Sequence, residues 1–154
     1  MLAPGESQSE SYPAVADSVA RARATVTAFA EEAGAGGERL EAIRLAASEA
    51  VTNAVKHAYG GGGGGTINLC ASYVQDELWL LIADSGSGLR AHSKRPGLGL
   101  GLMLIAQLAD DFQIHSRAAG GTEVQMRFRL RSPKPRPRPA RQLRGSFSSA
   151  VSPA

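Results

Sequence analysis

The stretch SEAVTNAVKH, residues 48–57, carries the most informative pattern in the chain. Glu49 and Asn53 are four residues apart, and Lys56 lies three residues beyond Asn53. In a helix this spacing places the three polar side chains on one face, beside an apolar face. Surface helices usually have a polar face, so the pattern alone predicts an amphipathic helix and leaves a functional role open.

Helical periodicity extends on the amino-terminal side of this stretch. A helix is predicted over residues 38–59, with a buried face made of Leu40, Ile43, Ala47, Ala50, Val51 and Ala54. An earlier helix is predicted over residues 13–33 from the apolar positions Val15, Val19, Ala22, Val26 and Phe29, and GAGG at 34–37 ends it. Six glycines at residues 60–65 end the second helix and predict a flexible connector.

The region after the glycines predicts mainly strands. Strands are expected over residues 66–74, 77–83, 111–116 and 122–130, with turns at Gln75-Asp76 and at residues 118–121. A loop is expected over residues 84–96 and an apolar helix over residues 98–108. Helices followed by hairpin-linked strands indicate an α+β fold, in which helices cover one face of a mixed, mostly antiparallel sheet.

The segment Asp84-Ser85-Gly86-Ser87-Gly88 directly follows the predicted buried strand. A carboxylate at a strand end can accept a hydrogen bond from a ligand amine, and the glycines allow a ligand to approach the backbone closely. The same residues also suit an ordinary Asp-Ser-Gly turn.

Two further glycine-rich segments accompany it. GLGLGLM at residues 97–103 opens the predicted apolar helix, and the free N–H groups at a helix start form a natural anion site. No Gly-Lys-Ser/Thr follows, so this is not a P-loop, and the strand context of a dinucleotide-binding fingerprint is missing. Gly120-Gly121-Thr122 predicts a tight turn that carries a hydroxyl into the last strand.

Charge divides the chain into a domain and a tail. The net charge is +3, but residues 131–154 hold six basic residues and no acidic one, which leaves −3 on residues 1–130. Alternating prolines and basic residues cannot form a core, so the tail is expected to be disordered. It either acts as a weak electrostatic arm for nucleic acid, RNA polymerase or an acidic partner, or is simply solvated. Residues 1–10 are expected to be flexible, leaving a domain over residues 11–130.

Several classes of protein are not expected. The longest apolar run covers residues 78–83, far short of the roughly 20 residues that span a bilayer. The N-terminus lacks the pattern of a signal peptide, and the single cysteine, Cys70, excludes an internal disulfide. We expect a cytoplasmic protein without a membrane association, and no direct nucleic-acid binding beyond a weak contribution of the tail.

Together, the four segments resemble in order and spacing the GHKL ATP-binding (Bergerat) fold, a two-layer α/β sandwich shared by histidine kinases, type II topoisomerases, Hsp90 and MutL. The resemblance covers residues 13–130 and is greatest to the small anti-sigma-factor serine/threonine kinases. In that branch the N-box is similar to SEAVTNA at residues 48–54 followed by HAY at residues 57–59.

The resemblance implies a role for each matching residue. Glu49 would be the general base, and Asn53 would bind Mg²⁺ and so contribute to the ATP site. Asp84 would bind the adenine amine in a pocket shaped by Gly86 and Gly88, with support from Thr122. The lid hinge and phosphate cradle would comprise Gly97, Leu98, Gly99, Leu100 and Gly101. Arg95 is the preferred phosphate contact over Arg90 and Lys94 because it lies close to Gly97. Lys56 either contacts phosphate or is solvated, and His57 is expected to be packed rather than catalytic.

The resemblance also implies an activity and partners. The chain would be an ATP- and Mg²⁺-dependent serine/threonine protein kinase that regulates transcription as an anti-sigma factor. It would form a homodimer, phosphorylate an anti-anti-sigma antagonist and sequester a sigma factor. Two alternatives stay open: a nucleotide-gated binding module without significant kinase activity, and a histidine-kinase-type catalytic domain acting in trans.

Overall fold

The computed structural model describes residues 1–58, 64–86 and 98–131, with the side chains of residues 57, 58, 98 and 99 left out. In chain order its elements are β1 (Ser7–Pro13), α1 (Asp17–Glu32), α2 (Gly37–Asn53), the π-helical turn η1 (Ala54–Ala58), β2 (Thr66–Val74), β3 (Glu77–Asp84), α3 (Leu98–Leu108), β4 (Asp111–Ser116) and β5 (Thr122–Arg129). Within these residues, no helix combines the length and apolar character needed to cross a membrane.

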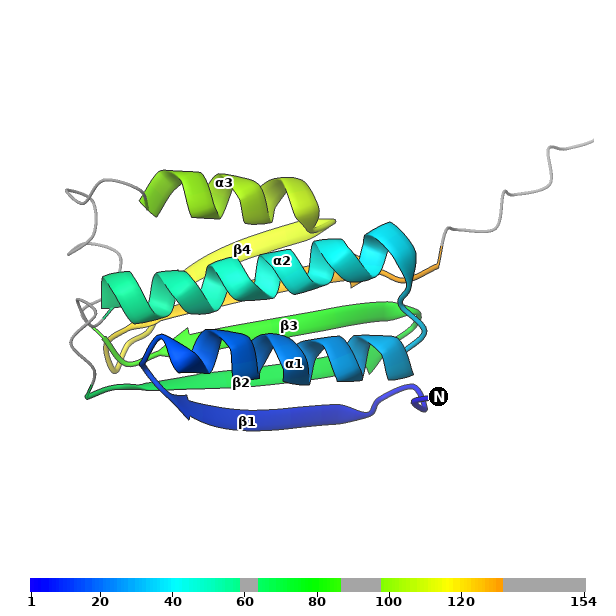
Figure 1. Ribbon diagram of the computed structural model, residues 1–154, viewed down its shortest axis with the longest axis horizontal. Coiled ribbons are helices and arrows are strands. Elements are labelled where there is room, and N and C mark those ends of the chain that lie inside the picture. Colours follow the sequence, from blue (N-terminus) through cyan, green and yellow to red (C-terminus); the bar gives the residue numbers. More distant parts are fainter. Residues whose placement is uncertain (59–63, 87–97, 132–154) are drawn as a thin grey trace, which may run out of the picture.

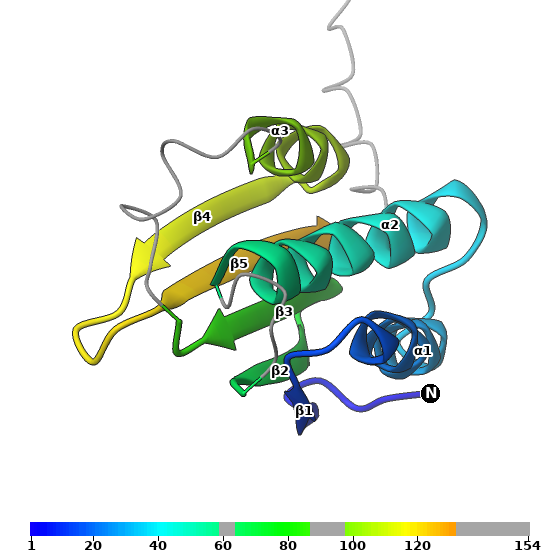
Figure 2. The same ribbon diagram turned by 60° about the vertical axis from the view of Figure 1, so that its left-hand side comes forward.

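The strands form one sheet in the order β1-β2-β3-β5-β4, and the three helices lie on a single face of it (Figures 1 and 2). The predicted two-layer α+β fold is confirmed. Every neighbouring pair among the described strands is antiparallel, so the sheet is not mixed. A short turn explains the pairing of β2 with β3, because Gln75 and Asp76 both have positive φ, as a two-residue hairpin with a type I′ turn requires.

The strand β1 corrects the expected start of the domain. Residues 1–10 were expected to be flexible, whereas β1 begins at Ser7 and pairs with β2 from Ser7↔Ser72 to Pro13↔Thr66. Most β1 side chains are exposed, so the strand lacks the alternation of apolar residues that would have predicted it. Backbone hydrogen bonds to β2 hold it as a polar edge strand that ends in proline, a composition typical of sheet edges.

One buried side chain ties β1 to the helical layer. Tyr12 is 2% exposed, and its hydroxyl donates to Glu10 Oε2 at 2.6 Å and lies 2.6 Å from Thr25 Oγ1 of α1. Burial raises the pKa of Tyr12, and the hydrogen bond from Tyr12 lowers the pKa of Glu10. These bonds connect the edge strand to α1 and satisfy the buried phenol.

The first helix is shorter than its periodicity predicts. Residue 13 is the last of β1, and Val15, expected to be buried, is 40% exposed in the connection to α1. At the other end, Gly34 has φ +99°, and its N–H donates to Glu31 while the N–H of Ala35 donates to Ala30. This pair of bonds is a Schellman motif, so glycine ends the helix as predicted.

The second helix changes conformation at the site of interest. The predicted helix over residues 38–59 is α-helical only to Asn53 and continues as the π-helical turn η1. Because a π turn contains more residues than an α turn, side chains after Asn53 leave the spacing that the α-helical pattern assumes.

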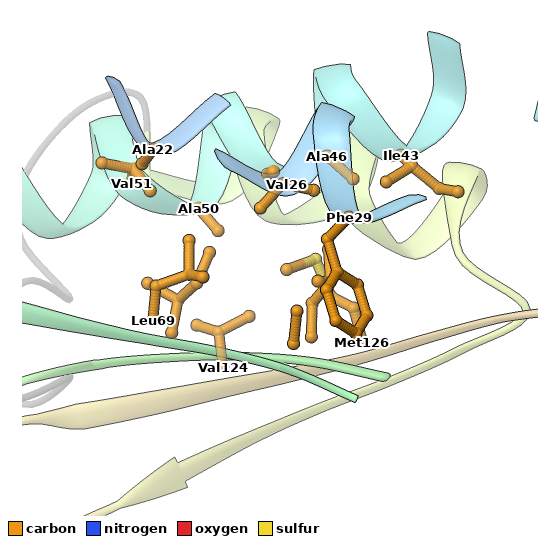
Figure 3. Close-up of a cluster of buried hydrophobic side chains, with 14 of the residues drawn as sticks. Ala22, Val26, Phe29, Ile43, Ala46, Ala50, Val51, Leu69, Val124 and Met126 are labelled. Carbon is orange, nitrogen blue, oxygen red and sulfur yellow. The ribbon is translucent and has the colours of Figure 1, made fainter. Parts of the chain in front are cut away.

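The core lies between the helices and the sheet (Figure 3). Ala22, Val26 and Phe29 of α1 and Ile43, Ala46, Ala50 and Val51 of α2 face Leu69, Val124 and Met126 of the sheet. Two of the four α2 residues are alanines and all four are buried, so this face packs α2 closely against the strands. Leu40, predicted for the same face, is only partly buried. The packing turns the other side of α2, with Glu49, away from the sheet.

Candidate active site

Glu49 and Asn53 lie one turn apart on α2 and meet the first part of α3 at Gly101. A Cβ atom placed on Gly101 would lie 2.9 Å from Asn53 Nδ2, 3.0 Å from Asn53 Oδ1 and 3.3 Å from Glu49 Oε2. Glycine therefore allows the α3 backbone to lie directly against both polar groups. We call Glu49, Asn53 and Gly101 the helical half of the site.

The amide of Asn53 has unused hydrogen-bonding capacity. Its Nδ2 atom is buried and has no hydrogen-bond partner in the part of the chain that the structure describes. An unsatisfied buried donor costs about 1–3 kcal/mol, and such groups in native proteins call for an explanation. A ligand that accepts a hydrogen bond from this amide would explain the unpaired donor. Asn53 is therefore the strongest candidate for a ligand-binding residue in the helical half.

Asp84 is held at the end of β3 by backbone groups from two segments. Its side chain is buried, with 6% of the residue exposed. Oδ1 accepts hydrogen bonds from the N–H of Gly86 at 2.9 Å and from the N–H of Thr122 at 3.4 Å. These donors offset the desolvation of a buried carboxylate and fix its orientation. Thr122, itself 9% exposed, begins β5 beside it.

The turn before Thr122 touches the backbone of Asp84. Gly121 has φ +91°, and a Cβ on it would lie 2.7 Å from the carbonyl carbon of Asp84 and 2.8 Å from Ser85 Cα. A Cβ on the neighbouring Gly120, with φ +94°, would meet, among the described residues, only Gly86 O within 4 Å, at 3.8 Å. The predicted tight turn is confirmed, and glycine at 121 is required by contact as well as by conformation. Asp84, Gly121 and Thr122 form the hairpin half of the site.

Arg117 joins this turn to β3 and was not identified from the sequence. Its Nη1 donates to Asp84 O at 3.2 Å, and its backbone bonds with Gly120 and Gly121 at 3.0 Å close the turn. An arginine at the end of a polar strand follows no periodic pattern, so only the three-dimensional contact distinguishes it.

Both halves lie at the same end of the molecule. The carboxyl end of α2, the amino end of α3, the end of β3 and the turn between β4 and β5 gather on the left of Figure 1. The first turn of α3 contributes free backbone N–H groups and the positive end of the helix dipole at this end. The arrangement can hold an anion near α3 and a hydrogen-bonding ring near Asp84.

The remaining predicted site residues are either exposed to solvent or only partly described, or lie outside the described residues. Lys56 is exposed in η1, and Leu100 is 75% exposed in the first turn of α3. Leu98 and Gly99 belong to the same turn, but only their backbone is described. The predictions for Gly88, Arg90, Lys94, Arg95 and Gly97 fall outside the described residues, as does the side chain of His57.

A helix start and a buried carboxylate thus lie at the same end of a two-layer sandwich, an arrangement that suits a nucleotide. The family described as "Histidine kinase-like ATPase domain" matches residues 12–128, and the chain belongs to this family. The resemblance to the GHKL fold is thereby confirmed.

Within this family, the chain is similar to anti-sigma factors and serine-protein kinases. The chain is 32% identical over 117 residues to an anti-sigma F factor of Clostridium acetobutylicum, an alignment that covers 69% of this chain and 81% of that protein. It is 34% identical over 122 residues to the serine-protein kinase RsbW of Staphylococcus epidermidis, covering 69% and 77%. RsbW of Listeria monocytogenes is 30% identical over 118 residues, covering 67% and 75%.

A solved structure has the same fold. The crystal structure of the RsbU and RsbW domains of a Mycobacterium tuberculosis protein aligns with a TM-score of 0.65 and 26% sequence identity. The alignment covers 85% of this chain and 34% of that one, so the chain spans about a third of the length of that solved chain.

Proposed function

We propose that this chain is an ATP-dependent serine/threonine protein kinase that acts as an anti-sigma factor. It phosphorylates an anti-anti-sigma antagonist and sequesters a sigma factor, and so regulates transcription. The relatives named anti-sigma F factor and serine-protein kinase RsbW support this function. The observation that carries it is the meeting of Glu49 and Asn53 at Gly101, which brings a carboxylate and an unsatisfied amide to the start of α3.

In this proposal the two halves of the site bind different parts of ATP. The Asp84 carboxylate accepts a hydrogen bond from the adenine amine, with Gly86 and Thr122 beside it. The backbone of Leu98, Gly99, Leu100 and Gly101 at the start of α3 holds the phosphates. Gly88, Arg95 and Gly97 complete the pocket and lid, and Lys56 is a further phosphate contact.

The residues of the helical half fit a magnesium ion. Mg²⁺ prefers oxygen ligands and keeps several waters, so one protein oxygen together with phosphates is sufficient. Asn53 offers such an oxygen, and its Nδ2, which has no partner among the described residues, would donate to a phosphate oxygen rather than to the ion. The described residues contain no cluster of three or more His, Cys, Asp or Glu for a metal. When bound, the ion neutralises negative charge on the phosphates.

Glu49 is the general base of the reaction. The oxygen of the acceptor hydroxyl attacks the γ-phosphorus, the bond to the β-phosphate oxygen breaks, and ADP leaves. Glu49 takes the hydroxyl proton, so the products are a phosphoserine or phosphothreonine and ADP. Its position one turn from Asn53 and against Gly101 of α3 supports this role.

The proposed partners also set the expected assembly and location. A sigma factor acts on RNA polymerase, so the proposal places the chain in the cytoplasm, and the family implies a homodimer. Sedimentation of the purified chain checks the second point: a mass of two chains supports the dimer, and a mass of one chain at micromolar concentration contradicts it.

Transfer of label from γ-labelled ATP into an extract of the source cells tests the activity. We expect an acid-stable label on a small protein with the wild-type chain and no label with Glu49→Ala, while both bind ATP equally. An acid-labile label would instead indicate histidine phosphorylation, because phosphohistidine is hydrolysed in acid. ATP binding without any transfer would support the nucleotide-gated binding module.

A further inference from the structure

An open groove of about 750 Å³ runs along the solvent side of α2. Its apolar lining comes from all three helices: Val19 of α1, Leu45 of α2 and Leu108 of α3. Figure 2 shows how this is possible, since α2 lies between α1 and α3. The lining reaches from Glu38 to Thr52 of α2, a distance of about 21 Å along the helix.

One residue belongs both to this groove and to the candidate active site. Glu49 lines the groove, and its Oε2 lies 3.3 Å from the Cβ position of Gly101, against which the Asn53 amide also packs. Glu49 therefore connects the groove to the candidate active site. A base has to lie within about 3 Å of the hydroxyl whose proton it takes, so an acceptor hydroxyl at Glu49 would lie in the groove.

We infer that the groove is the docking surface for the segment of the protein substrate that carries the acceptor hydroxyl. This inference rests on the proposed kinase function and adds where the substrate binds. The segment lies along α2 with apolar side chains on Val19, Leu45 and Leu108, and it places its serine or threonine beside Glu49.

The chemistry of the lining suits a peptide segment. Leu45 is 42% exposed between charged neighbours, as expected of an apolar anchor that a partner covers. Arg44, also in the lining, donates to Glu41 Oε1 at 2.9 Å, so an ion pair lies on the groove wall. Arg23 adds a charged donor on the α1 side. A length of about 21 Å matches an amphipathic helix of about 14 residues laid in a groove.

A matched pair of substitutions tests the inference. Leu45 lies in the groove and Val74 at the end of β2, and they are 42% and 41% exposed. Changing either to Gln removes one exposed apolar side chain without adding charge near Glu49. The probe is the acceptor protein identified by label transfer and then purified. We expect Leu45→Gln to raise KM for this protein about tenfold, with kcat and ATP affinity unchanged, because one buried leucine contact is lost. Val74→Gln should leave all three values unchanged.

A photo-crosslinker provides a second measurement that does not depend on kinetics. p-Benzoylphenylalanine in place of Leu45 should crosslink to the purified acceptor protein, and the same group in place of Val74 should not. Equal KM values for the two Gln variants, or crosslinking only between copies of this chain, would overturn the inference while leaving the kinase function intact. No transfer by the wild-type chain would overturn the proposed function, and the docking surface with it.

Discussion

The two halves of the candidate active site satisfy their polar groups in different ways. In the hairpin half, the Asp84 carboxylate already accepts hydrogen bonds from the backbone of Gly86 and Thr122, and Gly121 lies against its main chain. In the helical half, Asn53 Nδ2 is buried and has no hydrogen-bond partner among the described residues. Backbone donors thus fix the orientation of the Asp84 carboxylate, whereas the Asn53 amide keeps an unpaired donor. This difference suits the proposed site, in which the hairpin half holds the adenine ring and the helical half takes part in phosphoryl transfer.

The largest effect is expected where the hairpin half is most tightly packed. Gly121→Ala places a Cβ against Asp84 and Ser85 at a φ of +91°, so it should lower the free energy of unfolding by about 3 kcal/mol or more. Gly120→Ala has a similar φ and would meet no described residue closer than 3.8 Å, so it should cost only about 1–2 kcal/mol. Urea denaturation of both variants measures the difference. Equal losses would show that the close contact with Asp84 contributes nothing.

In the helical half, the Gly101→Ala substitution should change ATP affinity while leaving the free energy of unfolding nearly unchanged. Gly101→Ala gains about 1 kcal/mol of helix propensity and crowds the Asn53 amide, so the unfolding free energy should change by less than about 1 kcal/mol. Its Cβ occupies the space beside Asn53 and Glu49, so ATP affinity should fall about tenfold, or about 1.4 kcal/mol. Calorimetric titration with Mg-ATP measures this.

The control for this variant lies on the same helix. Met103 is 61% exposed on α3, and Met103→Ala should leave ATP affinity unchanged. Unchanged affinity in Gly101→Ala as well would mean that the space beside Asn53 is not part of the nucleotide site.

The smallest effect is expected at the rim of the hairpin half. Arg117→Ala removes the hydrogen bond to Asp84 O, which at 3.2 Å and from an exposed side chain contributes about 0.5–1 kcal/mol. Thermal or urea unfolding should show this loss, and ATP affinity should weaken by no more than about threefold. Arg117→Lys keeps a hydrogen-bond donor and should recover part of the unfolding free energy that Arg117→Ala loses. A loss as large as that of Gly121→Ala would make Arg117 a principal support of the pocket.

Local patterns explain why much of this architecture was predictable. The spacing of Glu49 and Asn53 places both on one face of a helix, and the turn at Gln75 and Asp76 follows from the alternating strands around it. The order of the four motifs was sufficient to identify the family from its resemblance. These features depend on residues close together in the chain.

Features that depend on contacts between distant segments were not predictable in the same way. The strand β1 has no apolar alternation and exists because β2 offers it a backbone partner. The contact of Gly101 with Asn53 and the bond from Arg117 to Asp84 join residues 48 and 33 positions apart. The π-helical turn after Asn53 also departs from the α-helical period on which the prediction for Lys56 rested.

The central claim is that the hairpin half selects adenine and the helical half binds the metal-bound phosphates. Calorimetric affinities for ATP and GTP, each with and without Mg²⁺, test it in Asp84→Asn and Asn53→Ala. Guanine presents a carbonyl oxygen where adenine presents an amine, so Asp84→Asn should lose the preference for ATP and keep the gain in affinity from Mg²⁺. Asn53→Ala should lose that gain and keep the preference. If both variants lose the same property, or neither loses any, the division of the site into these two roles is wrong.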